Sequence, residues 1–269
     1  MQFGKIIGRF FLKPHLGLEG DDTENLVTIS ELIETYEAWP EWIQALPGKR
    51  VQLYTMFETS DVHPDIIEKM KLFERVIVPY DYLKDILTRH GVVAEAMNWY
   101  TSPLIRSKPT VLEKKRNPDN LVFLYVGTND IRKNVIKLVH TFEDLKHTLI
   151  VKTNHTRGLP NLKNVKYITG HRDLQQMAGL YNICDFVVSF SRGEGVGLPF
   201  LEAKYFNKPV ISHDGGVLST IKDDSWIVLP SREVEIDKIE IPLFLQKVFH
   251  GTWWEVDEKS FRDVVVNIS

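Results

Sequence analysis

The sequence has 269 residues, a length that suits one large domain or two smaller ones. Hydrophobic residues make up 43% and charged residues 26%, proportions typical of a globular protein with a sizeable core. The formal net charge of −3 gives no reason to expect a nucleic acid as partner. The single cysteine, Cys184, excludes an internal disulfide, and we therefore expect a reducing, cytoplasmic setting.

The first half of the chain contains short apolar runs typical of strands, separated by segments with helical spacing. The opening, up to Lys13, is too short for a membrane span and lacks a signal-peptide cleavage site, so we expect a strand and a loop there. The expected strands cover residues 5–8, 51–55, 75–79 and 92–97. The expected helices cover residues 23–38, 64–73 and 80–90.

The second half alternates more clearly between the two patterns. Apolar runs such as "LVFLYV" at 121–126 predict buried strands, and the segments between them have amphipathic helical spacing. The expected strands cover residues 121–126, 148–153, 165–169, 185–190, 209–213 and 225–229. The expected helices cover residues 131–146, 173–184 and 199–206. This alternation predicts an α/β fold with a parallel sheet, whose ligands sit beyond the carboxyl ends of the strands.

A polar, proline-containing segment at 106–120 separates the two halves and is the best linker candidate. It carries five basic residues against Glu113 and Asp119. Such basic runs are usually solvated surface, and contact with a membrane surface or a phosphate is the alternative.

A glycine-rich loop with two nearby glutamates follows the expected strand at 185–190. The stretch "SFSRGEGVGLPFLEAKYFNKPVISHDGG" places Glu194 in the loop and Glu202 about one turn inside the next helix. Pro199 fits the first position of that helix, whose free N–H groups suit an anion. Carboxylates suit the vicinal hydroxyls of a sugar, although most glutamates are simply solvated. The loop is not a dinucleotide fingerprint, because Leu198 occupies the third glycine position.

A second loop, "YVGTNDIRKN" at 125–134, places basic residues at the start of a helix. Arg132 and Lys133 are unfavourable for the helix dipole in that position, so an anionic ligand such as a diphosphate would explain them. A solvated basic pair is the alternative interpretation.

The two loops together resemble the donor-binding signature of retaining glycosyltransferases of the GT-B fold, glycosyltransferase family 4 (the "group 1" transferases). The similarity covers about 121–216 and includes the E-x7-E spacing of Glu194 and Glu202. It implies two Rossmann-like domains facing a cleft, the N-terminal one reduced. We therefore expect an acceptor-side domain at 1–105, a linker at 106–120, a nucleotide-sugar domain at 121–256, and a segment at 257–269 that packs back on the first domain.

The resemblance also implies roles for individual residues. Glu194 would meet the hydroxyls of the transferred sugar, and Arg132 and Lys133 would neutralise the departing diphosphate; these three are the catalytic candidates. Glu202 would hold the ribose of the nucleotide. The further substrate-binding candidates lie in glycine turns after strands: Gly17, Gly127, Gly170, His171, Gly195, Val196, Gly197 and Leu198.

The sequence departs from the family pattern at two places. Thr128 stands where the family often has an arginine directly after the glycine, so one phosphate contact is absent or supplied elsewhere. Beyond Gly216 the run "VLSTIKDD" lacks a glutamate that the family often carries there.

The expected activity is transfer of a hexose from a UDP- or GDP-linked sugar, with retention at the anomeric carbon, to a glycan, lipid or small-molecule acceptor. No D-x-D-type metal motif stands out, so we expect neither a metal nor another cofactor. A non-catalytic sugar-nucleotide-binding module and a GT-B-fold epimerase are the alternatives. Peripheral contact with a membrane is an open alternative to a freely cytoplasmic location.

Overall fold

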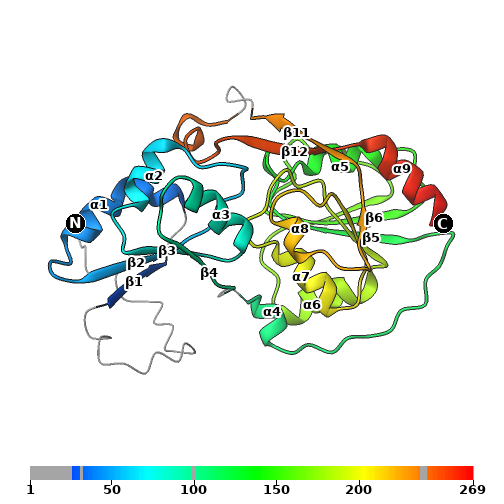
Figure 1. Cartoon of the computed structure of the whole chain (residues 1–269). Helices are drawn as coiled ribbons and strands as arrows, with labels where there is room; N and C mark the ends of the chain where they lie inside the picture. The colour runs from blue at the N-terminus through cyan, green and yellow to red at the C-terminus, as the bar shows by residue number, and fades with distance from the viewer. Residues whose placement is uncertain (1–25, 31–32, 99–100, 237–240, 269) are drawn as a thin grey trace.

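The computed structural model describes residues 26–30, 33–98, 101–236 and 241–268. Two α/β halves lie side by side, with the N-terminal half in blue and cyan and the C-terminal half in green and yellow (Figure 1). The expected strand at 5–8 and the candidate Gly17 lie outside the described residues.

The N-terminal half contains a four-stranded parallel sheet in the order β1-β2-β3-β4. Its strands are β1 (Leu26–Ser30), β2 (Arg50–Tyr54), β3 (Arg75–Val78) and β4 (Ala94–Ala96). Its helices are the 3-10 helix η3 (Ile33–Ala38), α1 (Trp39–Gln44), α2 (Pro64–Met70) and α3 (Asp81–Arg89). Three of the expected strands and two of the expected helices therefore form where the sequence predicts them.

The helix expected at 23–38 is wrong. Leu26–Ser30 is strand β1, which pairs in parallel with β2 from Leu26 opposite Arg50 to Ser30 opposite Tyr54. The segment "LVTIS" is rich in β-branched residues, which lose side-chain freedom in a helix and pack well on a sheet. Among the described residues of this range, only Ile33–Ala38 is helical, as a 3-10 helix.

The C-terminal half contains a six-stranded parallel sheet in the order β10-β9-β8-β5-β6-β7. Its strands are β5 (Val122–Val126), β6 (Thr148–Lys152), β7 (Val165–Ile168), β8 (Phe186–Val188), β9 (Val210–Ser212) and β10 (Ile227–Val228). The strand order reverses between β5 and β8, because the chain builds outward first on one side of β5 and then on the other. In doubly wound sheets, the carboxyl edge at such a switch point is where ligands bind.

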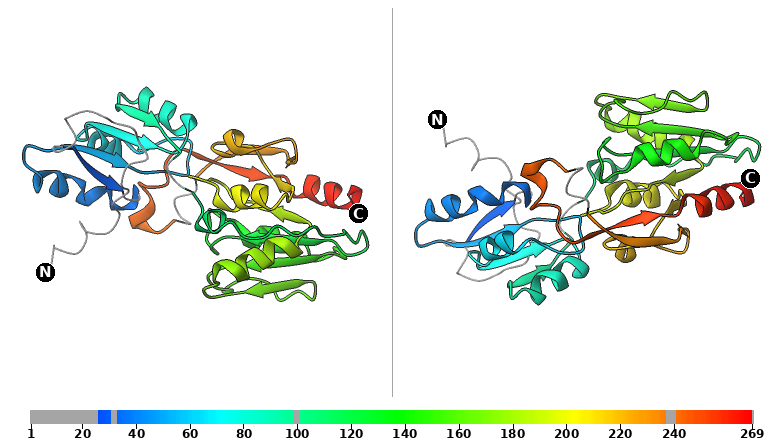
Figure 2. Two further views of the ribbon diagram at one scale, coloured as in Figure 1. Left: turned by 90° about the horizontal axis from the view of Figure 1, so that it is seen from below. Right: turned by 90° about the horizontal axis from the view of Figure 1, so that it is seen from above.

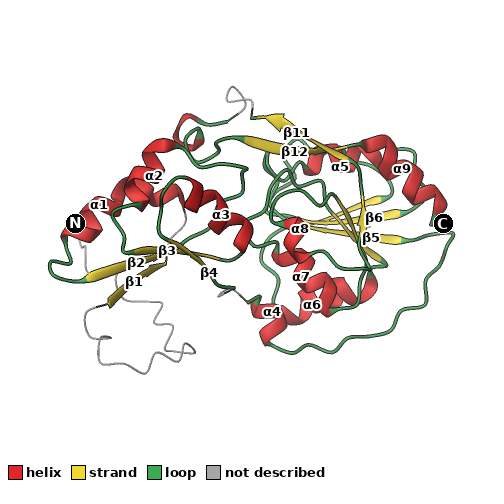
Figure 3. Cartoon of the chain, in the orientation of Figure 1, coloured by secondary structure: helices red, strands yellow, loops and turns green. Residues whose placement is uncertain are grey.

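Helices cover both faces of this sheet, as Figure 3 shows, with α5 and α9 on one face and α6 and α7 on the other. Side chains of β5 alternate accordingly: Phe123 and Tyr125 pack with the α5 face, and Leu124 packs with the opposite one. The helices are α5 (Val135–Thr141), α6 (Leu174–Ile183), α7 (Leu198–Tyr205), the short α8 (Leu218–Ile221) and α9 (Glu258–Asn267). The parallel sheet with helices on both faces is confirmed.

The C-terminal segment differs from the expectation. Residues 257–269 were expected on the N-terminal half, but α9 packs on α5, where the Phe261 and Phe142 rings lie 5.7 Å apart. The segment that contacts the N-terminal half lies before it, between β11 (Ser231–Glu235) and β12 (Thr252–Val256), with Lys247 Nζ 2.6 Å from Asp65 Oδ2. Strand β12 then runs to α9 (Figure 2). Phe261 packs against the rings of Phe123, Phe142 and Phe190. Burial of this apolar ring favours packing of α9 on the C-terminal half.

The linker expected at 106–120 lies along the C-terminal half. After helix α4 (Pro103–Arg106), the Leu112 amide donates to Asn182 Oδ1 at 2.8 Å, and Lys114 Nζ lies 2.6 Å from Asp185 Oδ2. Because these contacts tie the segment to α6 and β8, the chain crosses between the halves before it, at about Ser102. Across the described residues, no helix is both long and apolar enough to cross a membrane.

Candidate active site

The two predicted loops meet at the switch point of the larger sheet. The loop after β5 carries Arg132 and Lys133, and the loop after the adjacent strand β8 carries Glu194. The Arg192 amide donates to the carbonyl oxygen of Arg132 at 2.7 Å, which fixes one loop against the other. Residues 61 positions apart in sequence are thereby brought into one site.

Lys133 and Glu194 form a buried ion pair between Nζ and Oε1. The side chains are nearly sealed from solvent, since Lys133 is 9% and Glu194 8% exposed. Burial works to raise the pKa of Glu194, but Lys133 and Arg132 outweigh it and hold that pKa below the usual value for a glutamate. Glu194 is therefore ionised at neutral pH.

Arg132 connects this pair to the N-terminal half. Its Nη1 donates to the carbonyl oxygen of Gly193 at 2.8 Å, and its Nη2 lies 3.4 Å from Oε1 of Glu58. Burial works to lower the pKa of Arg132, but Glu58, Glu194 and Asp130 hold it above its ordinary value. Glu58 follows β2, and no local sequence signal indicates its contact with Arg132.

The glycine loop is packed closely beneath the N-terminal half. A Cβ atom at Gly193 would overlap the carbonyl oxygen of Glu58, and one at Gly195 would lie 3.0 Å from Cγ of Met56. The Tyr80 hydroxyl donates to the carbonyl oxygen of Val196 at 3.0 Å. Glycine is therefore required at Gly193 for close backbone approach between the halves, whereas at Gly195 the Met56 side chain would have to shift by a few tenths of an ångström.

The rest of the predicted glycine loop starts helix α7. Gly197 is the N-cap residue with φ of +73°, a left-handed conformation that favours glycine, and Leu198 is the first residue of the helix. The loop after β5 has a similar feature, because Asn134 adopts φ of +51° before α5. Asparagine is among the non-glycine residues that tolerate this conformation best.

Glu202 lies further along α7 and has different partners. Tyr181 donates from its hydroxyl to Oε2 at 2.6 Å, and the Ser102 hydroxyl donates to Oε1. Burial raises the pKa of Glu202, and these hydrogen bonds to the ionised form offset only part of that rise. Glu202 thus occupies a buried polar cluster beside the interdomain crossing.

We expect Glu202→Gln to be more stable than the wild type at pH 7. A carboxyl whose pKa is raised by folding destabilises the fold when it is ionised, and glutamine removes that charge. Its oxygen accepts from Ser102, and its NH2 group donates to the Tyr181 hydroxyl, whose own proton turns to the Pro199 carbonyl oxygen 3.4 Å away. The stability gap should begin to close as pH falls through the folded-state pKa and vanish below the unfolded-state value. Urea unfolding at a series of pH values measures this, with the exposed Glu68→Gln as control. If Glu202→Gln is less stable than the wild type at pH 7, the ionised carboxylate of Glu202 does not destabilise the fold and the prediction is wrong.

The other predicted residues lie at the same edge of the sheet. A Cβ at Gly127 would come within 2.6 Å of the Tyr125 hydroxyl, so packing alone requires glycine there. Gly170, with φ of +77°, and the exposed His171 follow β7, two strands away from β5. Two strand spacings are roughly 10 Å, so these two residues lie at the same edge of the sheet but apart from the Lys133–Glu194 pair.

The sequence does not predict the surroundings of the glycine pair Gly215–Gly216, which follows strand β9. His213 is buried; its Nδ1 accepts from the Gly215 amide at 2.9 Å, and its Nε2 lies 2.6 Å from the carbonyl oxygen of Ser191. Burial lowers the pKa of His213, so the ring is neutral and Nε2 carries the proton. Trp254 stacks on it, and a Cβ at Gly215 would overlap the indole. Gly215 thus packs on Trp254, a contact that no local sequence signal indicates.

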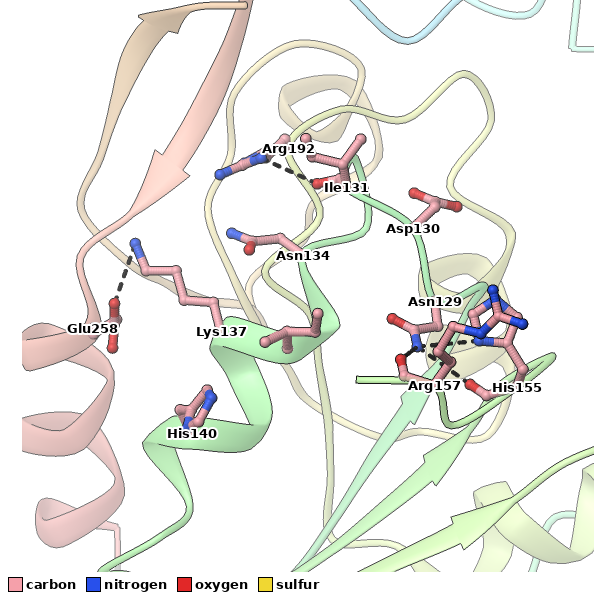
Figure 4. Close-up of a pocket in the computed structure, with 11 residues that line it drawn as sticks. Asn129, Asp130, Ile131, Asn134, Lys137, His140, His155, Arg157, Arg192 and Glu258 are labelled. Carbon is pink, nitrogen blue, oxygen red and sulfur yellow. Dashed lines mark hydrogen bonds and ion pairs between the residues drawn. The ribbon is translucent and has the colours of Figure 1, made fainter. Parts of the chain in front are cut away.

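An open pocket of about 680 Å³ lies on the outer side of the loop after β5, as Figure 4 shows. Asn129, Asn134 and Lys137 line it from α5 and its preceding loop, with Arg157 and Glu258 from other elements. None of the predicted catalytic or binding residues lines this pocket. Within the described ranges, no group of three or more His, Cys, Asp or Glu side chains is placed to hold a metal ion.

Two Rossmann-like halves that meet at a glycine loop define the GT-B architecture of glycosyltransferases. Residues 108–236, just under half of the chain, match the family described as glycosyl transferases group 1. This segment is therefore similar to the group 1 glycosyltransferases. No curated protein sequence matches the chain.

Solved structures with the same fold are distant in sequence. TarM shares 15% identity and a TM-score of 0.56, with 90% of this chain and 47% of TarM covered. Sucrose-phosphate synthase from Thermosynechococcus elongatus shares 16% identity and a TM-score of 0.55, with 91% and 69% covered. HepE from Anabaena shares 15% identity and a TM-score of 0.51, with 74% and 62% covered. The chain therefore spans about half the length of TarM.

Proposed function

We propose that the chain is a retaining glycosyltransferase that moves a hexose from a UDP- or GDP-linked sugar to an acceptor without a metal ion. The observation that carries this proposal is the buried Lys133–Glu194 pair with Arg132 beside it at the switch point. A buried pair of this kind is not an efficient way to stabilise a fold, so a ligand role is the better explanation.

The reaction breaks the bond between the anomeric carbon and the diphosphate, so negative charge develops on the departing phosphate. Arg132 and Lys133 supply positive charge there in a site of low dielectric, where electrostatic stabilisation is strongest. The Lys133 ammonium has three N–H donors, and Glu194 occupies one of them. It is therefore able to contact a phosphate oxygen while still holding Glu194 in place.

Glu194 then accepts hydrogen bonds from hydroxyls of the transferred sugar. Its carboxylate has about four lone-pair sites, so the pairing with Lys133 leaves acceptor capacity for a sugar. Glu202 holds the ribose, and the loop at Gly170 and His171 contacts the base. Retention follows from the family and not from these contacts.

The choice of donor is supported by what the structures of similar fold contain. The Anabaena HepE crystal structure holds UDP-glucose. A TarM mutant structure holds UDP, α-GlcNAc-glycerol and fondaparinux. A uridine nucleotide sugar is therefore the first donor to test, with a glycan or a small glycoside as acceptor.

A thermal-shift panel of UDP and GDP sugars tests the proposal. A ligand present at a hundred times its dissociation constant should add about 2.7 kcal/mol to the free energy of unfolding. The expected result is a shift with one nucleotide sugar that Arg132→Ala removes, followed by slow hydrolysis of that donor. If no nucleotide sugar shifts the unfolding temperature, the proposal is wrong.

A non-catalytic sugar-nucleotide-binding module is the second candidate, since Lys133 and Glu194 satisfy each other without a ligand. Such a module would show the same thermal shift with neither hydrolysis nor transfer in any acceptor screen. Hydrolysis that is lost in Glu194→Ala favours the enzyme.

A further inference from the structure

Both oxygens of the Glu202 carboxylate are held by hydroxyl groups inside the protein. Oε2 accepts from Tyr181 at 2.6 Å, and Oε1 accepts from Ser102. All three side chains are buried: Glu202 is 9%, Ser102 1% and Tyr181 0% exposed. The rotamer of this carboxylate is therefore fixed from two sides.

The two donors come from different parts of the chain. Tyr181 belongs to α6, and its ring is stacked on Phe206 with centroids 5.2 Å apart and planes 8° apart. Ser102 precedes α4, in the stretch that crosses between the halves, and is the N-cap residue of that helix. The interdomain crossing itself thus supplies one of the two hydrogen bonds.

The orientation of the Ser102 hydroxyl is determined by its second contact. Its Oγ accepts from the Leu104 amide at 3.2 Å, as an N-cap residue does. A hydroxyl has one proton, and with Oγ accepting from Leu104 that proton is directed to Glu202. The N-cap contact with Leu104 therefore also orients the hydroxyl of Ser102 for its hydrogen bond to Glu202.

From these contacts we propose that Ser102 is a positioning residue for ribose recognition by Glu202. The inference rests on the proposed function, in which Glu202 accepts from the ribose hydroxyls. A carboxylate offers about four lone-pair sites, and Ser102 and Tyr181 use two of them. The remaining sites are held in place to accept the vicinal hydroxyls without a search among rotamers. Ser102 acts through Glu202 and does not touch the ligand.

The test compares ribonucleotides with nucleotides that lack the ribose hydroxyls. Binding of UDP and GDP, each against its 2′,3′-dideoxy analogue, is measured by calorimetry for the wild type, Ser102→Ala, Ser102→Thr and Tyr181→Phe. The wild type should prefer the ribonucleotide by about tenfold or more, since a hydrogen bond to a charged group is lost in the analogue. Ser102→Ala and Tyr181→Phe should each lower that preference by about threefold or more. Ser102→Thr keeps a hydroxyl group and should therefore retain the wild-type preference for the ribonucleotide.

The ratio of the two affinities separates positioning from stability. Ser102→Ala also loses the cap of α4, but any loss of folded protein lowers both affinities equally and leaves the ratio unchanged. An unchanged ratio in Ser102→Ala overturns the inference. Inorganic pyrophosphate is the companion probe, because it reaches only the basic pair and its affinity should be the same in all four proteins.

Pyrophosphate also distinguishes this failure from failure of the proposed function. If the wild type binds neither pyrophosphate nor nucleotide, the proposed donor site is wrong and the inference falls with it. If pyrophosphate binds normally and the wild type shows no preference for the ribonucleotide, only the role of Glu202 and Ser102 is refuted.

Discussion

Replacing Lys133 with methionine is expected to lower the free energy of unfolding by about 3–5 kcal/mol, because it leaves Glu194 buried without its partner. Glu194 is 8% exposed, so water does not replace the lost ammonium. The same change should lower the rate of transfer by about 10²–10³-fold, the usual effect of removing one group that stabilises developing charge. Urea unfolding and single-turnover kinetics with the preferred nucleotide sugar measure the two effects.

The stability deficit of Lys133→Met should depend on pH. Without Lys133, burial favours the protonated form of Glu194, whose pKa the lysine otherwise helps to hold low. The deficit should be largest near neutral pH and shrink as pH falls and Glu194 takes up a proton. If the loss of stability in Lys133→Met does not change as pH falls, Lys133 stabilises the fold through packing and not through its charge.

Two further variants separate these causes. Lys133→Met combined with Glu194→Gln should recover much of the stability, since neither buried charge remains, while transfer stays impaired. Lys84→Met removes a partly exposed lysine whose Nζ lies 2.8 Å from Oδ1 of Asp81, and should leave the free energy of unfolding nearly unchanged. Recovery of transfer in the double variant would refute the catalytic role.

The fold of the C-terminal half could be predicted from sequence because its strands are buried on both faces. Runs such as "LVFLYV" have no polar face, and this pattern is characteristic of parallel sheets with helices on both sides. The sequence pattern does not indicate strand β1, because "LVTIS" is short and lies beside residues with helical spacing. The parallel partner that makes it a strand, Arg50–Tyr54, is a separate segment of the chain.

The candidate site was predicted as two loops but not as one network. The sequence indicates a ligand for Lys133 and for Glu194 separately, and their pairing depends on β5 and β8 being neighbours. The same holds for Ser102 with Glu202, and for Trp254 against Gly215. Local sequence indicates which residues lie at the carboxyl edge of the sheet; the contacts between distant segments come from the strand order and the crossing.

Replacing Gly193 with alanine is the second change with a large expected effect. The new methyl group would overlap the carbonyl oxygen of Glu58, which is backbone and unable to turn away. Overpacking of this kind costs about 1–3 kcal/mol or more. The loop must also shift the Gly193 carbonyl that Arg132 contacts, and a displacement of about 1 Å is enough to lower the rate about 10²-fold. Thermal unfolding and donor turnover measure the two losses.

Gly179→Ala is the matched control, because it makes the same chemical change where the structure has room. Gly179 lies inside α6, and beyond the helix itself no atom lies within 4 Å of the position that the alanine methyl group would occupy. Alanine in a helix interior is favoured over glycine by roughly 0.5–1 kcal/mol, so this variant should be slightly more stable than the wild type. The two glycine variants should therefore move stability in opposite directions. If Gly193→Ala retains wild-type stability and turnover, the glycine loop does not pack against the Glu58 backbone. The proposed contact between the two halves through Arg132 is then refuted as well.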